Sequence, residues 1–192
     1  MNSEVLAIQS NETAPVRHYN PAQKDYATIL KSASEEEGGL TFLEVEVAPG
    51  GGTDPHYHLS YAEHFEVLEG TLTVGVENRT YTLQKGECAV APINSLHYFR
   101  NNTTEPARFL VEIRPGSIGF ENSIKVSYGL ARDGKTWSDS TPKNFYHLAL
   151  LLDWGDISLP GLMGKMLPIF RFLAKRAKKK GIDRMLLEKY CG

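Results

Sequence analysis

The sequence predicts a mainly β protein in which an antiparallel barrel is followed by α-helices. At least seven short segments between residues 25 and 114 show the alternating apolar and polar pattern of half-buried strands. Turn signals separate these segments about every 8 to 12 residues, which is typical of a closed or double-sheet antiparallel barrel. From Pro142 onward, the apolar residues recur at helical spacing instead.

The composition is that of an ordinary globular protein with one hydrophobic core. Hydrophobic residues make up 41% and charged residues 23% of the 192-residue chain. No uncharged apolar stretch reaches about 18 residues, and residues 1–14 lack the basic start and apolar stretch of a signal peptide. Cys88 and Cys191 are too few for a disulfide scaffold or a thiolate metal site. We therefore expect a cytoplasmic protein.

The charges are distributed unevenly along the chain. Residues 160–192 contain nine lysines and arginines against two acidic residues, although the whole chain has a formal net charge of -2. The acidic remainder argues against nucleic acid as a partner of the barrel. The basic tail is expected to pack on the outside of the barrel, with a dimer contact as the second interpretation and a membrane surface as the third.

The first part of the chain contains an arm and two predicted strands. Residues 1–15 are polar and receive no assigned function. Residues 25–30 form a plausible strand, which the charged and glycine-containing residues 32–39 interrupt. Residues 41–47 alternate, with Leu43, Val45 and Val47 on the face that should belong to the core.

The remaining predicted strands are short and closely spaced. Residues 63–69 form a strand that ends at Gly70, where the chain reverses. Further strands are expected at residues 72–76, 80–84 and 88–91, around His97 and Phe99, and at residues 107–114 before Pro115 and Gly116 stop the last one.

The helical part begins after an ambiguous segment at residues 123–129, which fits either a strand or a short helix. Residues 144–154 form a predicted helix. In residues 161–180, Pro168 must kink the helix or begin a second one, and Gly181 is the expected C-cap. Asp183 is the predicted N-cap of a last short helix that ends near Tyr190.

Four polar residues stand out as candidate metal ligands. His56 and His58 are one residue apart, so on an extended chain their imidazoles point to the same side. Glu63 can return to them if the chain turns at residues 60–62, and His97 on a later strand would complete a set of three nitrogens and one oxygen. His64 should point away from His56 on the pleat.

The spacing of these four residues, with that of Gly50, Gly70, Gly86 and Pro92, resembles the two sequence motifs of the cupin superfamily. One position departs, because cupins usually have glycine where this chain has Asn94, a residue that tolerates positive φ better than most. The resemblance covers about residues 40–115. It implies a double-stranded β-helix, or jelly roll, with an N-terminal arm and first strand at residues 1–35, the barrel at 36–116, and a mostly helical extension at 117–192.

The resemblance also implies ligands and functions. His56, His58, Glu63 and His97 match the cupin positions that hold one divalent transition metal, which would be Fe, Mn, Ni or Zn. Phe65, Val67 and Phe99 are expected to form the apolar wall of a cavity for a small-molecule ligand. The open functions are an iron-dependent oxygenase or an isomerase, a non-catalytic binding or sensing module, and a barrel without metal. A homodimer is expected, because barrels of this type have sheet edges that need covering.

Overall fold

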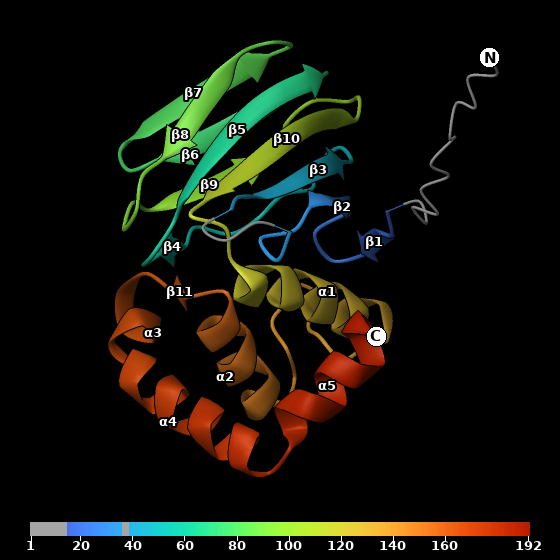
Figure 1. Cartoon of the computed structure of the whole chain (residues 1–192). Helices are drawn as coiled ribbons and strands as arrows, with labels where there is room; N and C mark the ends of the chain where they lie inside the picture. The colour runs from blue at the N-terminus through green and yellow to red at the C-terminus, as the bar shows by residue number, and fades with distance from the viewer. Residues whose placement is uncertain (1–14, 36–38) are drawn as a thin grey trace, which may run out of the picture.

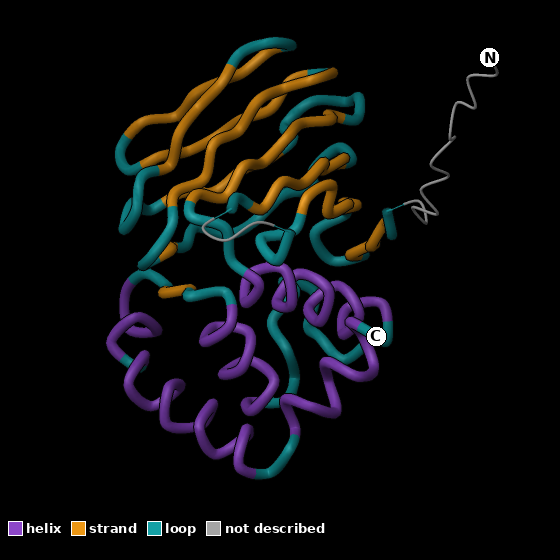
Figure 2. The backbone as a smooth tube through the Cα atoms, viewed as in Figure 1, coloured by secondary structure: helices purple, strands orange, loops and turns teal. Residues whose placement is uncertain are grey.

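The computed structural model describes residues 15–35 and 39–192, so nearly all of the predicted N-terminal arm lies outside the described residues. Figure 1 shows the larger sheets together in one half of the molecule and the helices together in the other. The tube in Figure 2 shows the same division, with strands and helices in separate layers. None of the helices within residues 15–35 and 39–192 has the length and apolar character needed to cross a bilayer.

The strands of the described part form antiparallel sheets. They are β1 (Arg17–Asn20), β2 (Asp25–Lys31), β3 (Thr41–Val47), β4 (Tyr57–His58), β5 (Ala62–Glu69), β6 (Thr71–Val76), β7 (Arg79–Gln84), β8 (Cys88–Ala91), β9 (His97–Arg100), β10 (Ala107–Arg114) and β11 (Ile157–Ser158). The spatial order is β1-β2-β3-β10-β5-β8 in the larger sheet and β7-β6-β9 in the second sheet, while β11 pairs with β4. The mainly β jelly-roll fold is thus confirmed, as two antiparallel sheets rather than one closed ladder.

The predicted alternation places one face of each central strand in a shared core. In β3, Leu43, Val45 and Val47 are buried and the residues between them are half-buried. In β5, Phe65 and Val67 are buried on the same side as Glu63. Side chains from both larger sheets meet in this apolar cluster, which therefore joins them into one body.

The helices have a second apolar core of their own, so the expectation of a single hydrophobic core was wrong. They are α1 (Ile118–Arg132), α2 (Phe145–Trp154), α3 (Gly161–Lys165), α4 (Leu167–Lys179) and α5 (Ile182–Cys191). The buried side chains of α2 meet those of α4 and α5, and α1 contacts β1, α2 and α5. The helices thus pack on the β half through α1 and α2. On the side away from the sheets, α4 packs on α2, and α5 packs on α1 and α2 (Figure 1).

The structure decides several open points of the sequence. The ambiguous residues 123–129 lie inside α1, which begins where the Ser117 side chain accepts a hydrogen bond from the Phe120 amide. Pro168 lies in the first turn of α4 and so begins a second helix. Gly181, at φ 71°, precedes α5, so the prediction that Asp183 is the N-cap was wrong. The short strand β1 was not predicted.

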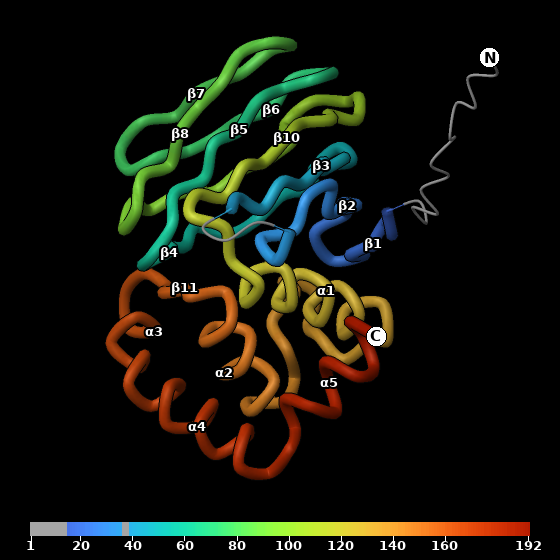
Figure 3. The backbone as a smooth tube through the Cα atoms, viewed as in Figure 1, coloured from blue at the N-terminus to red at the C-terminus, as the bar shows by residue number. Residues whose placement is uncertain are grey.

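Two segments far apart in sequence bring the halves together at one corner. Figure 3 shows β4 and β11 side by side, and their register pairs Tyr57 with Ser158 and His58 with Ile157. The Leu59 amide also donates to the Asp156 carbonyl at 3.2 Å. The loop after α2 is therefore hydrogen-bonded to the segment that carries His56 and His58.

Candidate functional site

The structure brings His56, His58, Glu63 and His97 together. His56 and His97 exchange two backbone hydrogen bonds, of 3.0 and 2.9 Å, which places their side chains next to each other. The Nε2 atoms of His56 and His58 are 3.2 Å apart. The Glu63 carboxylate lies 3.3 Å from His58 Nε2 and 3.4 Å from His97 Nε2. One ligand atom of each histidine thus lies within 4.8 Å of the others.

Backbone carbonyls fix the orientation of all three imidazoles. The Nδ1 atoms of His56, His58 and His97 lie 2.7, 3.0 and 2.9 Å from the carbonyl oxygens of Asp54, Gly155 and Ser95. A carbonyl only accepts, so in the neutral imidazole each Nδ1 carries the proton and each Nε2 presents a lone pair to the centre. Such hydrogen bonds are the usual support of histidines that bind metals.

The four side chains therefore present hydrogen-bond acceptors, and few donors, to the space between them. His97 Nε2 is buried and makes no hydrogen bond within the described residues. Three inward lone pairs and one carboxylate repel one another unless a cation or an added proton lies between them. The donor set consequently fits a divalent transition metal.

The pKa values of three of these side chains are shifted by burial and by their neighbours. Burial, followed by the charges of His58 and His97, lowers the pKa of His56 to about 3. Burial would raise the pKa of Glu63, but contacts with His58 and His97 hold it well below its usual range. Burial would likewise lower the pKa of His97, but the Glu63 carboxylate outweighs it and raises that pKa. Glu63 is thus an anion at neutral pH, as a metal ligand must be.

The helical half contributes directly to this centre through one carbonyl. Gly155, the residue after α2, accepts hydrogen bonds from His58 Nδ1 and from the Tyr61 hydroxyl. The Tyr61 ring also stacks on His58, with the ring centroids 4.4 Å apart. Sequence reasoning identified neither residue as part of the site, and only the position of Tyr61 in the predicted turn hinted at its proximity.

The four residues line a chamber of about 430 Å³ between the sheets and the helices. From the sheets, Phe65 and Phe99 form part of its wall, whereas Val67 does not line it and lies in the apolar core beside them. The helical layer supplies a second apolar wall, which consists of Phe120, Ile124, Leu148, Leu151, Leu152, Ile157 and Leu159. A chamber of this size is suited to a small molecule.

Three further residues near the motifs lie outside the chamber or at its edge. His64 is half-buried and pairs with Glu112 and Val90, on the face of β5 opposite Glu63. Arg100 lines the chamber, 3.4 Å from Asp54. Asn94, where the cupin motif has glycine, adopts φ 62°, so the positive φ expected at this position is present.

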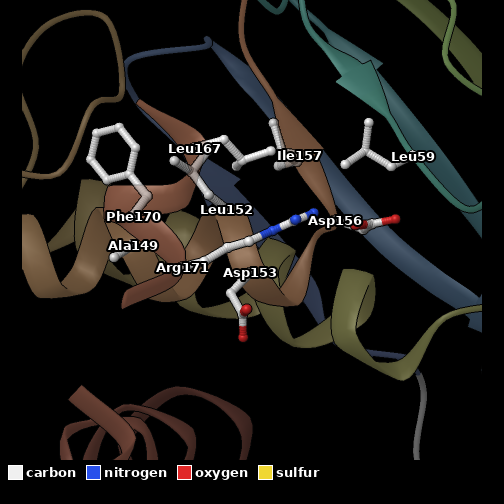
Figure 4. A pocket seen from close by; sticks show the side chains of 9 residues that line it. All are labelled: Leu59, Ala149, Leu152, Asp153, Asp156, Ile157, Leu167, Phe170 and Arg171. Carbon is white, nitrogen blue, oxygen red and sulfur yellow. The ribbon is translucent and has the colours of Figure 1, made fainter. Parts of the chain in front are cut away.

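A smaller hollow of about 130 Å³ lies behind the chamber, between the helices and β11. Figure 4 shows its lining, with the Arg171 side chain extending across it toward Asp156. Leu152 and Ile157 line both spaces and therefore separate them. No histidine lines this hollow, so it is not the candidate metal centre.

Sequence comparison relates the β half to known proteins. Residues 43–113 match the family model of the cupin domain. The rhicadhesin receptor of Pisum sativum is 35% identical over 88 residues, which are 42% of this chain and 41% of the receptor. Germin-like protein 5-1 of Oryza sativa subsp. japonica is 38% identical over 93 residues, which are 43% of this chain and 42% of that protein. This chain thus spans less than half of the length of either relative.

Solved structures give matches of similar extent. A sugar phosphate isomerase from a cupin superfamily of Silicibacter pomeroyi is 24% identical, with a TM-score of 0.47, and the match covers 53% of this chain and 71% of that chain. The polyketide cyclase RemF from Streptomyces resistomycificus is also 24% identical with a TM-score of 0.47, over 55% of this chain and 78% of the other. Residues 43–113, which match the cupin domain, include His56, His58, Glu63 and His97, so the candidate metal centre lies within a cupin domain.

Proposed function

We propose that the protein is a metal-dependent enzyme that acts on a small molecule inside the chamber. His56, His58, Glu63 and His97 would hold one divalent transition metal, which is Fe, Mn, Ni or Zn. The observation that supports this most directly is the convergence of three Nε2 lone pairs whose Nδ1 atoms are tied to carbonyls. An ion in this place would supply Lewis acidity and an open coordination position.

The chain's own residues would bind and orient the substrate. The apolar walls from the sheets and from the helices exclude water from the space in front of the four ligands. Imidazole and carboxylate ligands together are typical of non-haem iron sites with oxygen chemistry, so we favour an oxygenase, with an isomerase next.

The lining indicates a largely apolar and uncharged substrate. Among the described residues that line the chamber, Arg100 is the one lysine or arginine, and Asp54 lies beside it. A phosphate or dicarboxylate would find no unpaired lysine or arginine on the described chamber wall. Polar side chains that could bind hydroxyl or carbonyl groups lie at one part of the wall, at Asn20, Gln23, Thr53 and residues 138–141.

A non-catalytic binding module is the second candidate. It is favoured by the small number of other titratable side chains on the described chamber wall, which are Asp54, Arg100, Tyr128 and Asp139. Arg100 lies beside Asp54, and the Tyr128 hydroxyl donates to Asp25 at 2.9 Å. An enzyme of the kind we propose would therefore depend on the metal ligands for its chemistry.

The test is metal analysis of protein purified without added metal, followed by oxygen-consumption screening of the loaded protein. We expect about one ion per chain and a higher melting temperature on adding Fe(II), Mn(II), Ni(II) or Zn(II), because a ligand of the folded state stabilises it. His58→Ala should abolish both effects, and His64→Ala, on the opposite face of β5, should change neither. No metal together with an unchanged melting temperature would reject the proposal. A bound metal without oxygen consumption or isomerisation of any apolar, uncharged compound would favour the binding module.

A further inference from the structure

One face of α4 combines exposed apolar and basic side chains. The helix buries Phe170, Ala174 and Ala177 against the other helices. On the opposite side, Ile169 is 53% and Phe172 61% exposed. Three and four residues apart are neighbours on a helix, so Lys175 and Lys179 extend the row from Phe172. We call Ile169, Phe172, Lys175 and Lys179 the outer face of α4.

The preceding helix α3 adds side chains of the same two kinds. Leu162 is 73% exposed, the highest exposed fraction among the large apolar side chains of the described residues. Lys165, at the end of α3, is also exposed. Figure 1 shows α4 along the border of the molecule remote from the larger sheets, with α3 before it near β11, so the larger sheets do not obstruct the approach of a broad surface to α4.

The cations of this face have no ion-pair partner in the described part of the chain. The ion pairs found there include Lys178, which reaches Asp153 at 2.6 Å, but none that involves Lys165, Lys175 or Lys179. Lys178 lies about 100° around the helix from Lys179 and so belongs to a different side. The outer face thus presents positive charge that the protein itself does not neutralise.

We propose that the outer face of α4, with Leu162 and Lys165, binds peripherally to the surface of an anionic lipid bilayer. Leu162, Ile169 and Phe172 enter the boundary between headgroups and acyl chains, and the lysines lie beside the lipid phosphates. Other classes of partner fit this combination of apolar and basic side chains less well. Nucleic acid or an acidic peptide would pair the lysines and leave the aliphatic side chains unused, and a symmetric contact with a second copy would bring like charges together.

The test is co-sedimentation of the full chain with vesicles of phosphatidylcholine, with and without phosphatidylglycerol. We expect the protein to pellet with the anionic vesicles only, and less so as salt rises, because salt screens the charges. Phe172→Ala should weaken binding about tenfold or more, because it removes a large apolar side chain from the interface. Lys175→Glu with Lys179→Glu should weaken it at least as much, because each lysine near an anionic surface contributes about 1 kcal/mol.

Matched variants on the β half provide the controls. Val90→Ala removes an apolar side chain that is 52% exposed on β8, and Lys85→Glu reverses an exposed charge in the turn between β7 and β8. Both should leave vesicle binding unchanged, and all variants should keep the melting temperature. The proposal is overturned if anionic vesicles do not pellet the protein, or if Phe172→Ala binds like Val90→Ala. It is equally overturned if light scattering shows a self-association that Phe172→Ala abolishes, since the face would then bind a second copy.

Discussion

Asp25 carries a carboxyl group that is buried in surroundings that disfavour its ionised form. It is fully buried, its Oδ2 accepts from Tyr128 at 2.9 Å, and its Oδ1 has no partner among the described residues. Burial raises the pKa of Asp25 to about 7, although the Tyr128 hydrogen bond acts in the opposite direction. The folded state therefore holds this proton more tightly than the unfolded chain does.

This shift predicts that stability falls as pH rises. A raised pKa in the folded state gives stability that is fully present below about pH 4 and is lost as pH rises through about 7. Asp25→Asn cannot ionise, so its unfolding free energy should fall less between pH 5 and 8, by a difference on the order of 2 to 4 kcal/mol. Urea unfolding at several pH values measures this, with the exposed Asp139→Asn as the control. Parallel curves for wild type and Asp25→Asn would contradict the prediction.

Tyr61 is expected to position His58 through the carbonyl that they share. Tyr61→Phe keeps the ring that stacks on His58 and removes the hydroxyl that donates to Gly155. We expect a loss of about 1 kcal/mol in unfolding free energy, the net value of one hydrogen bond, and a several-fold weaker affinity for a divalent metal by calorimetric titration. Tyr57→Phe is the control, since no hydrogen bond of the Tyr57 hydroxyl occurs in the described structure. Equal metal affinities for both variants would exclude the positioning role.

At the residue scale, the sequence predicted which four side chains lie together but not the groups that orient them. His56, His58 and Glu63 lie close together in the chain, so strand alternation and one turn suffice to bring them together. Gly155 lies 97 residues beyond His58 and 94 beyond Tyr61. That contact depends on where α2 packs, which no local pattern specifies. Val67 was misplaced for a related reason, because alternation gives the face of a strand and not the depth at which a cavity ends.

Among the helices, α2 contributes side chains both to the chamber wall and to the helical core. Five successive residues, Leu148 to Leu152, are buried, so the helix is covered on more than one side. Leu148, Leu151 and Leu152 line the chamber, while Leu150 faces the helical core. Apolar residues around much of a helix are typical of a buried helix, and residues 148–152 are all apolar in the sequence. No equivalent pattern indicates α1, because buried polar side chains such as Glu121 interrupt its apolar residues.

The central place of α2 makes Leu150 a sensitive position. Leu150 has no exposed surface, and Leu150→Ala would leave a cavity in the helical core. We expect a loss of about 2 to 5 kcal/mol in unfolding free energy, as is usual for truncation of a buried leucine. Chemical denaturation measures this loss. Leu162→Ala, at an exposed leucine of α3, should cost less than about 0.5 kcal/mol. Similar losses at the two positions would show that the helical core is not tightly packed.

For the whole molecule, a homodimer remains a prediction from the exposed sheet edges. β1 and β8 are the edges of the larger sheet, and edge strands with free backbone groups tend to be paired or covered. We expect light scattering to give twice the mass of the 21.4 kDa chain at micromolar concentration. A monomeric mass across that range would remove this prediction, and it would leave the edges to be covered by other parts of the chain.

The two halves of the molecule should depend on each other for stability and for metal binding. Removal of residues 142–192 deletes α2 and β11, bares Val126 and Leu130 of α1, and takes away the carbonyl that orients His58. We expect a lower melting temperature, aggregation through the exposed apolar surface, and metal affinity that is about tenfold or more weaker.

A shorter truncation separates these causes. A chain that ends at residue 180 loses α5, including the packing of Tyr190 against Gly129, but keeps α2 and β11. It should be less stable than the full chain, yet bind metal with unchanged affinity, because His58 Nδ1 still donates to Gly155. Thermal unfolding and metal titration of both truncations test this. If the chain that lacks residues 142–192 keeps the metal affinity of the full chain, the helical half only covers the chamber and does not support the candidate metal centre.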